Sequence, residues 1–116
     1  MRAWVFDPNS GGTKIPDEIK KKIEKRLMLA AKNKFTKDPK LSVRFKNQFC
    51  YIDSSQDSAE PMPLCRLRYL EYKEPKAWSV AFYAYSSERY EPCVYPSGEW
   101  HGTPEEALDV VSVYLS

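Results

Sequence analysis

Leu64-Cys65-Arg66-Leu67-Arg68-Tyr69-Leu70-Glu71-Tyr72 is the stretch that decides the fold, because its apolar and charged side chains alternate with the period of a β-strand. This alternation places Cys65, Leu67 and Tyr69 on one face of the strand, and Arg66 and Arg68 on the other. Guanidinium groups need water or polar partners. We therefore expect the arginine face to be the solvent side of a sheet whose other face is buried.

A second alternating stretch follows after the four residues 73–76, a length that suits a hairpin connection. It is Ala77-Trp78-Ser79-Val80-Ala81-Phe82-Tyr83-Ala84-Tyr85. Both of its faces are apolar, which predicts a central strand covered at least partly on each side. A phenol can hydrogen-bond to water through its hydroxyl, so its exposure is less unfavourable than that of an indole or a phenyl ring. We therefore expect Tyr83 and Tyr85 to be the half-exposed side chains of this strand.

Outside this pair, the sequence predicts two helices and three more strands. Pro16, followed by Asp17 and Glu18, predicts the start of a helix whose apolar stripe includes Ile19, Ile23, Leu27, Ala30 and Ala31. Its outer face carries Lys20, Lys21, Lys22, Lys25, Arg26 and Lys32. Residues 4–12 predict a short extended piece and a tight turn, and residues 54–63 predict a surface loop. Residues 41–46 and 49–52 predict a hairpin that turns at Asn47. Residues 91–95 predict a short strand, in which Pro92 favours a sheet edge.

The second helix has the strongest local signal. Thr103, Pro104 and Glu106 form a capping box with proline at the first helical position, so a helix should run from there to about Leu115. Its apolar arc is wider than one sheet face requires, so part of it should pack against the first helix or against a second subunit. This predicts a homodimer through the C-terminal helix.

Together these elements predict one α+β domain over residues 1–116, in the order α-β-β-β-β-β-α. The sheet is an antiparallel meander of about five strands, with both helices on one face. The opposite face should show Arg44, Lys46, Arg66, Arg68 and some of the tyrosines.

Composition limits the classes of protein that fit. Apolar residues make up 42% and charged residues 29% of the 116 positions, and no apolar run approaches the roughly 20 residues that span a bilayer. The start of the chain lacks a signal-peptide layout, so we expect a cytoplasmic protein without a membrane partner.

Three cysteines, Cys50, Cys65 and Cys93, lack paired spacing, which favours reduced, mostly buried thiols. Residues 1–50 carry a net charge of +8 (13 − 5) and residues 51–116 a net charge of −6 (5 − 11). This difference is typical of two differently charged helices, of a face that binds polyanions, or of head-to-tail association.

The sequence shows no catalytic residue, metal ligand set or cofactor motif. His101 is the one histidine and lacks partners at a defined spacing, so we interpret it as a loop residue. Cys65 adjoins Arg66, but neighbours on a strand point to opposite faces, so the pair does not indicate an activated thiol.

One feature points to binding: the interleaving of Arg44, Lys46, Arg66 and Arg68 with Tyr72, Tyr83 and Tyr85 on one sheet face. A solvated face is the simplest interpretation. A protein interface comes second, because Tyr and Arg are enriched at interfaces. Single-stranded nucleic acid comes third, because bases stack on aromatic rings while arginines follow phosphates. The chain thus reads as a non-enzymatic binding or assembly module, with nucleic-acid binding and then a small enzyme as the alternatives.

Several segments also resemble a family of small bacterial proteins of unknown function. They are Cys65-Arg66-Leu67-Arg68-Tyr69, Trp78 to Ser86, Tyr90-Glu91-Pro92-Cys93-Val94 and Gly102-Thr103-Pro104-Glu105-Glu106-Ala107, with further counterparts at Phe6-Asp7-Pro8, Ser10-Gly11-Gly12 and Phe49 to Asp53. The resemblance covers nearly the whole chain and implies no activity.

Overall fold

The computed structural model describes residues 12–34, 40–55, 61–70 and 78–115. Two helices and six strands follow one another along the chain. They are α1 (Asp17–Lys34), β1 (Lys40–Lys46), β2 (Phe49–Ser55), β3 (Met62–Tyr69), β4 (Trp78–Ala84), β5 (Arg89–Cys93), β6 (His101–Gly102) and α2 (Pro104–Leu115). The predicted α+β class is confirmed, with one helix before and one helix after the strands of an antiparallel sheet along the chain.

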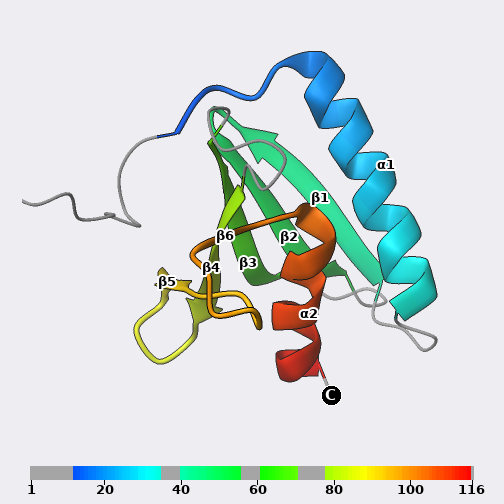
Figure 1. Ribbon diagram of the computed structural model, residues 1–116. Helices are drawn as coiled ribbons and strands as arrows, with labels where there is room; N and C mark the ends of the chain where they lie inside the picture. The colour runs from blue at the N-terminus through cyan, green and yellow to red at the C-terminus, as the bar shows by residue number, and fades with distance from the viewer. Residues whose placement is uncertain (1–11, 35–39, 56–60, 71–77, 116) are drawn as a thin grey trace, which may run out of the picture.

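The sheet has the order β1-β2-β3-β4-β5, and every neighbouring pair is antiparallel. The short strand β6 pairs with β4 beyond the end of β5, at Trp78 and Ser79. β5 therefore lies at the edge of the main sheet, as Pro92 predicted. Both helices pack on the same face of this sheet, with α2 over β3 and β4 and α1 over β1 (Figure 1).

Local signals explain several of these boundaries. Asn47 has a φ of 55°, so it takes the left-handed conformation that the tight β1–β2 turn requires. At the start of α2, the Thr103 side chain accepts a hydrogen bond from the Glu106 N–H, and Glu106 accepts one from the Thr103 N–H at 3.0 Å. The predicted capping box is thus present.

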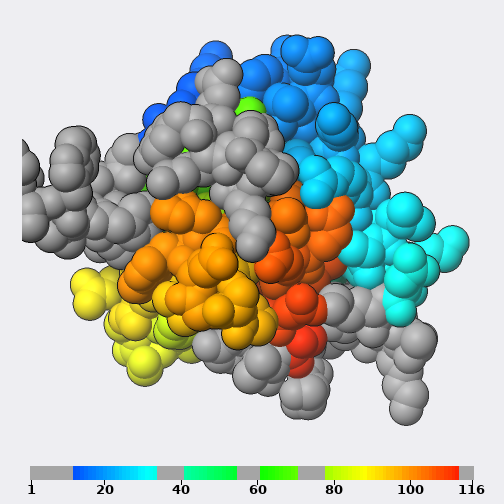
Figure 2. Space-filling view, viewed as in Figure 1, coloured from blue at the N-terminus to red at the C-terminus, as the bar shows by residue number. Residues whose placement is uncertain are grey.

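The core lies between the sheet and the helices. Its largest fully buried side chains include Leu27 of α1, Ile52 of β2, Leu67 of β3 and Leu108 of α2. The predicted alternation in β3 is confirmed, because Cys65, Leu67 and Tyr69 face this core. The surfaces of the two helices adjoin each other on this side of the molecule (Figure 2).

Four expectations need correction. β3 begins at Met62 and β2 extends to Ser55, so the loop predicted over residues 54–63 is shorter at both ends. Residues 101–102 form β6, where the sequence suggested a loop. The strand predicted over residues 91–95 is β5, which begins at Arg89 and ends at Cys93 and therefore includes Tyr90. Arg26 does not belong to the solvated face of α1, because it donates two hydrogen bonds to Glu105 of α2. The extended piece expected within residues 1–11 and the turn expected at residues 73–76 lie outside the described residues.

Candidate functional site

The sheet face that points away from the helices carries two rows of side chains that run across the strands. The strand register aligns Arg44, Tyr51, Arg66, Ala81 and Pro92 in one row and Lys46, Phe49, Arg68, Ser79 and His101 in the other. Each row begins with a cation on β1, continues with a ring on β2 and a second cation on β3, and then reaches a small residue on β4. We call this surface the arginine–tyrosine face and include in it Asp53, Tyr83, Tyr85 and Tyr90, which adjoin the rows.

The guanidinium groups of this face lie over aromatic rings. Arg44 is 4.2 Å from the centroid of the Tyr51 ring. Arg66 lies between two rings, at 4.2 Å from Phe49 and 4.9 Å from Tyr90. Such cation–π contacts fix the planes of the guanidinium groups without neutralising their charge. No described carboxylate forms an ion pair with Arg66, so its charge is not compensated by an acid within the described residues.

The rings also contact one another and form a continuous series from β2 to the end of β4. Successive centroids are 6.0 Å apart for Phe49 and Tyr51, 5.6 Å for Tyr51 and Tyr90, 5.1 Å for Tyr90 and Tyr83, and 4.8 Å for Tyr83 and Tyr85. The last three contacts are edge-to-face, which is a favourable geometry for aromatic pairs. The Tyr85 hydroxyl donates to the Pro63 carbonyl at 2.7 Å, so the outermost ring is tied to β3.

Asp53 is the acid of this face. It is only 4% exposed, and one of its oxygens, Oδ2, accepts a hydrogen bond from Nε of Arg44 at 3.0 Å. This hydrogen bond raises the pKa of Arg44, which stays charged. Burial, followed by the charge of Asp53, raises the pKa of Tyr90 to about 12, so its phenol is neutral at physiological pH. The face therefore carries a fixed excess of positive charge and uncharged phenols.

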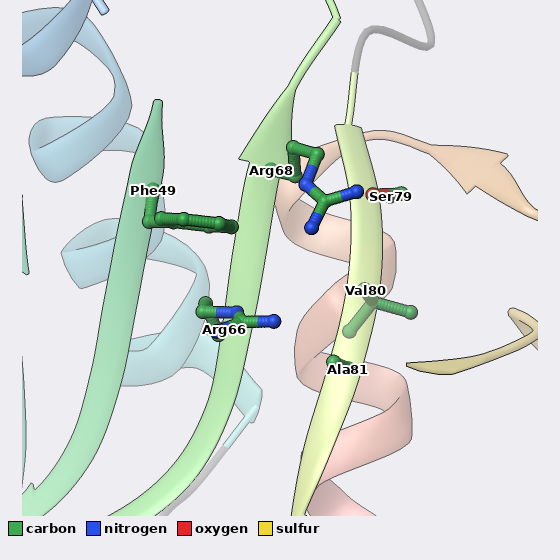
Figure 3. A pocket seen from close by; sticks show the side chains of 6 residues that line it. All are labelled: Phe49, Arg66, Arg68, Ser79, Val80 and Ala81. Carbon is green, nitrogen blue, oxygen red and sulfur yellow. The ribbon is translucent and has the colours of Figure 1, made fainter. Parts of the chain in front are cut away.

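A small pocket opens between β2, β3 and β4 on this face. It is lined by Phe49, Arg66, Arg68, Ser79, Val80 and Ala81, and it leaves about 10 Å³ for the centre of a water molecule, roughly the room of one water (Figure 3). Figure 3 shows both arginines projecting from β3 on the side away from the helices. The pocket is thus too small for a metabolite, and it is lined by one half-buried and one buried arginine, Arg66 and Arg68.

The structure brings most of the predicted site residues onto one face. Arg44 and Lys46 are exposed, Arg66 and Tyr83 are half-buried, and Tyr85 is exposed. Tyr72 lies outside the described residues. The expectation that both arginines of β3 reach solvent is wrong for Arg68, which is 6% exposed.

The burial of Arg68 has a tertiary cause. Residues 12–15 pass this end of the sheet on their way to α1, where Thr13 N–H donates to the Tyr69 carbonyl and Ile15 N–H to the Asn47 carbonyl. A Cβ on Gly12 would lie 2.9 Å from Cγ of Arg68, so this backbone lies directly against the arginine side chain.

Sequence reasoning missed Phe49, Tyr51, Asp53 and Tyr90 as members of this face. The signal for Phe49 and Tyr51 was available, because they alternate with Cys50 and Ile52, which are fully buried in the core. Tyr90 was missed because the predicted strand began one residue after it. The position of Asp53 follows a register shift between Ile52 and Asp53, which no pattern in the sequence reveals.

The other candidate groups do not form a reactive centre among the described residues. Burial raises the pKa of Cys50 to about 12 and the pKa of Cys65 well above its usual value, which is the opposite of what a nucleophilic thiol needs. His101 pairs with Ser79 across β6 and β4. In the described part of the chain, no three His, Cys, Asp or Glu side chains gather to hold a metal ion, and no helix there is long and apolar enough to cross a membrane.

Comparison of the chain with models of protein families, with curated proteins and with solved structures gave no match. The resemblance to a family of small bacterial proteins therefore stays a prediction.

Proposed function

We propose that the chain is a small non-enzymatic binding module and that the arginine–tyrosine face is its ligand surface. The observation that carries the proposal is the placement of Arg66. This half-buried guanidinium lies between the rings of Phe49 and Tyr90, at the rim of a pocket, without a carboxylate partner among the described residues. A folding role alone does not require an uncompensated cation in this position, since an apolar residue packs against two rings without any desolvation cost.

The surroundings of Arg66 support the same proposal. Tyr and Arg are the residues most often found at the energetic centres of interfaces, and here they form a continuous surface on the face that the helices leave uncovered. The rings and guanidinium planes hold one another in place, so little side-chain freedom is lost when a ligand binds.

Mapping of NMR shifts on the ¹⁵N-labelled chain tests the proposal. The probes are a single-stranded 12-mer oligonucleotide, poly-L-glutamate and inorganic phosphate, each titrated at low salt. We expect at least one probe to shift the amide resonances of Arg44, Arg66 and Ala81 saturably, while those of Lys21 and Lys22 on α1 stay unchanged. Saturable shifts confined to α1, or none with any probe, contradict the proposal.

A homodimer through α2 and a cytoplasmic location remain predictions of the sequence. The apolar side chains Ala107, Leu108, Val110 and Val111 are already buried within this chain, so they leave little area for a second subunit. Light scattering over a concentration series tests this, and a monomer at high concentration removes the dimer.

A further inference from the structure

We propose that the ligand of the arginine–tyrosine face is single-stranded nucleic acid, an inference that rests on the binding function proposed above. The proposal follows from how cations, rings and small residues are arranged in the two rows that cross the sheet. The cations would contact the phosphates of an unpaired strand, and the rings and guanidinium planes would stack on its bases.

The cations lie where a phosphate backbone would need them. Arg44 and Lys46 are two residues apart on β1, about 7 Å along the strand, and both are exposed. Arg66 lies two strands away, about 10 Å across the sheet. A polyanion lying across β1 to β3 would contact all three. Asp53 offsets the charge of Arg44, with which it forms an ion pair, but no ion pair joins it to Lys46 or Arg66 among the described residues.

The flat groups supply stacking platforms. Unpaired bases stack on aromatic side chains and on guanidinium planes. The plane of Arg44 is backed by Tyr51, and its side chain is 57% exposed, so its outer side is open to a base. Tyr85, with 52% of its surface exposed, offers a ring at the other end of the aromatic series. Burial raises the pKa of Tyr85 and of Tyr90, so both phenols are neutral at physiological pH.

The combination favours an unpaired strand over two other polyanions. A duplex hides the flat faces of its bases, so it would engage the cations and leave the rings without partners. An acidic peptide would likewise use only the cations. Single-stranded nucleic acid is the ligand class that would engage both the cations and the rings of the face.

Fluorescence anisotropy with a labelled 12-mer tests the inference in 50 mM salt, with oligo-dT and oligo-rU as separate probes. The double variant Arg44→Gln with Arg66→Gln removes two charges from the face. The matched control, Lys21→Gln with Lys22→Gln, removes two exposed charges from α1. We expect at least a tenfold loss of affinity for the first variant and less than a twofold change for the second. In a salt titration, the slope of log K against log[salt] should fall by about 1.4 in the face variant, about 0.7 for each lost phosphate contact.

Two competitors distinguish binding through charge alone from binding that also involves the bases. Inorganic polyphosphate of twelve units has the charges without the bases, and a 12-bp duplex has bases that are already stacked. Both should compete at least tenfold more weakly than the unlabelled single strand. Equal competition by either one overturns the inference, as does an equal loss of affinity in the two charge variants.

The two proposals fail in distinguishable ways. If no single strand binds but poly-L-glutamate binds and shifts the amide resonances of Arg44 and Arg66, the nucleic-acid inference is wrong and the binding function stands. If no probe reaches the face, both are wrong. If circular dichroism shows that the face variant does not fold, NMR mapping of oligo-dT on the unaltered chain replaces it as the test. We expect shifts of the amide resonances of Arg44, Arg66 and Ala81. Shifts of other resonances instead of these overturn the inference.

Discussion

At the scale of single residues, the backbone of Gly102 lies directly against the ring of Tyr95. A Cβ on Gly102 would lie 2.9 Å from Cε1 and Cζ of the Tyr95 ring. That ring cannot move aside easily, because Tyr95 is 1% exposed and its hydroxyl donates to the Trp78 carbonyl at 2.9 Å. Glycine at 102 is thus required by packing, where β6 meets the core.

We therefore expect Gly102→Ala to lower the free energy of unfolding by about 1–3 kcal/mol, the usual cost of an overpacked core. Urea unfolding at pH 7 measures it. Gly98→Ala is the comparison, because Gly98 has a φ of +88° and open space around it, so its cost of about 1 kcal/mol would come from the backbone alone. A Gly102→Ala chain as stable as the original would show that the ring of Tyr95 is free to shift.

Residue burial was the least predictable property from sequence. The parity of Arg66 and Arg68 was predicted and is confirmed, because alternation along a strand is a local property. Their different exposures were not predicted, because the cover over Arg68 comes from residues 12–15, more than fifty positions away along the chain. Periodicity specifies the face on which a side chain lies but not what else lies on that face.

At the scale of elements, an ion pair between Arg26 and Glu105 links the two helices. Nε and Nη2 of Arg26 donate to the Glu105 carboxylate at 2.7 and 2.6 Å, in the two-pronged geometry typical of arginine and carboxylate. Burial raises the pKa of Glu105, but the hydrogen bonds from Arg26 and the backbone outweigh it, so the net pKa is lowered. The pair orients α2 against α1 near the capping box.

A double-mutant cycle of Arg26→Gln and Glu105→Gln should give a coupling energy of about 0.5–1 kcal/mol at pH 7, since both side chains are more than a third exposed. Because folding lowers the pKa of Glu105, the coupling is present above the ordinary pKa of 4.5 and disappears as the pH falls through the lowered value. Urea unfolding at pH 7 and pH 3 measures it. Asp17 and Lys20, at 3.5 Å with the aspartate 93% exposed, should couple by at most about 0.3 kcal/mol. Equal coupling in the two cycles contradicts the expectation.

Elements with a local signal were predicted well and those without one were missed. The capping box of α2, the turn at Asn47 and the edge position of Pro92 are each specified by a few adjacent residues. In contrast, β6 has two residues and exists only because β4 extends past the end of β5 and leaves Trp78 and Ser79 open to pairing. The candidate site follows the same division, because its cations were predicted, whereas three of its five described rings were not.

At the scale of the whole molecule, the core holds several ionisable groups in their neutral form. Burial raises the pKa of Cys50 to about 12 and holds the pKa of Cys65 and of Tyr95 well above their usual values. Burial also raises the pKa of Cys93. These groups are all protonated in the folded chain at pH values where the unfolded chain begins to lose its protons.

The chain should therefore lose stability in alkali. A group whose pKa is raised by folding stabilises the fold fully below its unfolded pKa, here 9.0 for a thiol, and this contribution is lost as the pH rises towards the folded value. Each of Cys50 and Cys65 should remove about 1 kcal/mol from the free energy of unfolding between pH 9 and pH 10. Urea unfolding under reducing conditions at pH 7, 8, 9 and 10 measures this. Cys50→Ala is the control, since it should lower stability at every pH yet reduce the alkaline slope by about a third. A free energy of unfolding that stays constant from pH 8 to pH 10 would mean that water reaches these thiols in the folded chain, and the core between the sheet and the helices would then be less closed than its burial indicates.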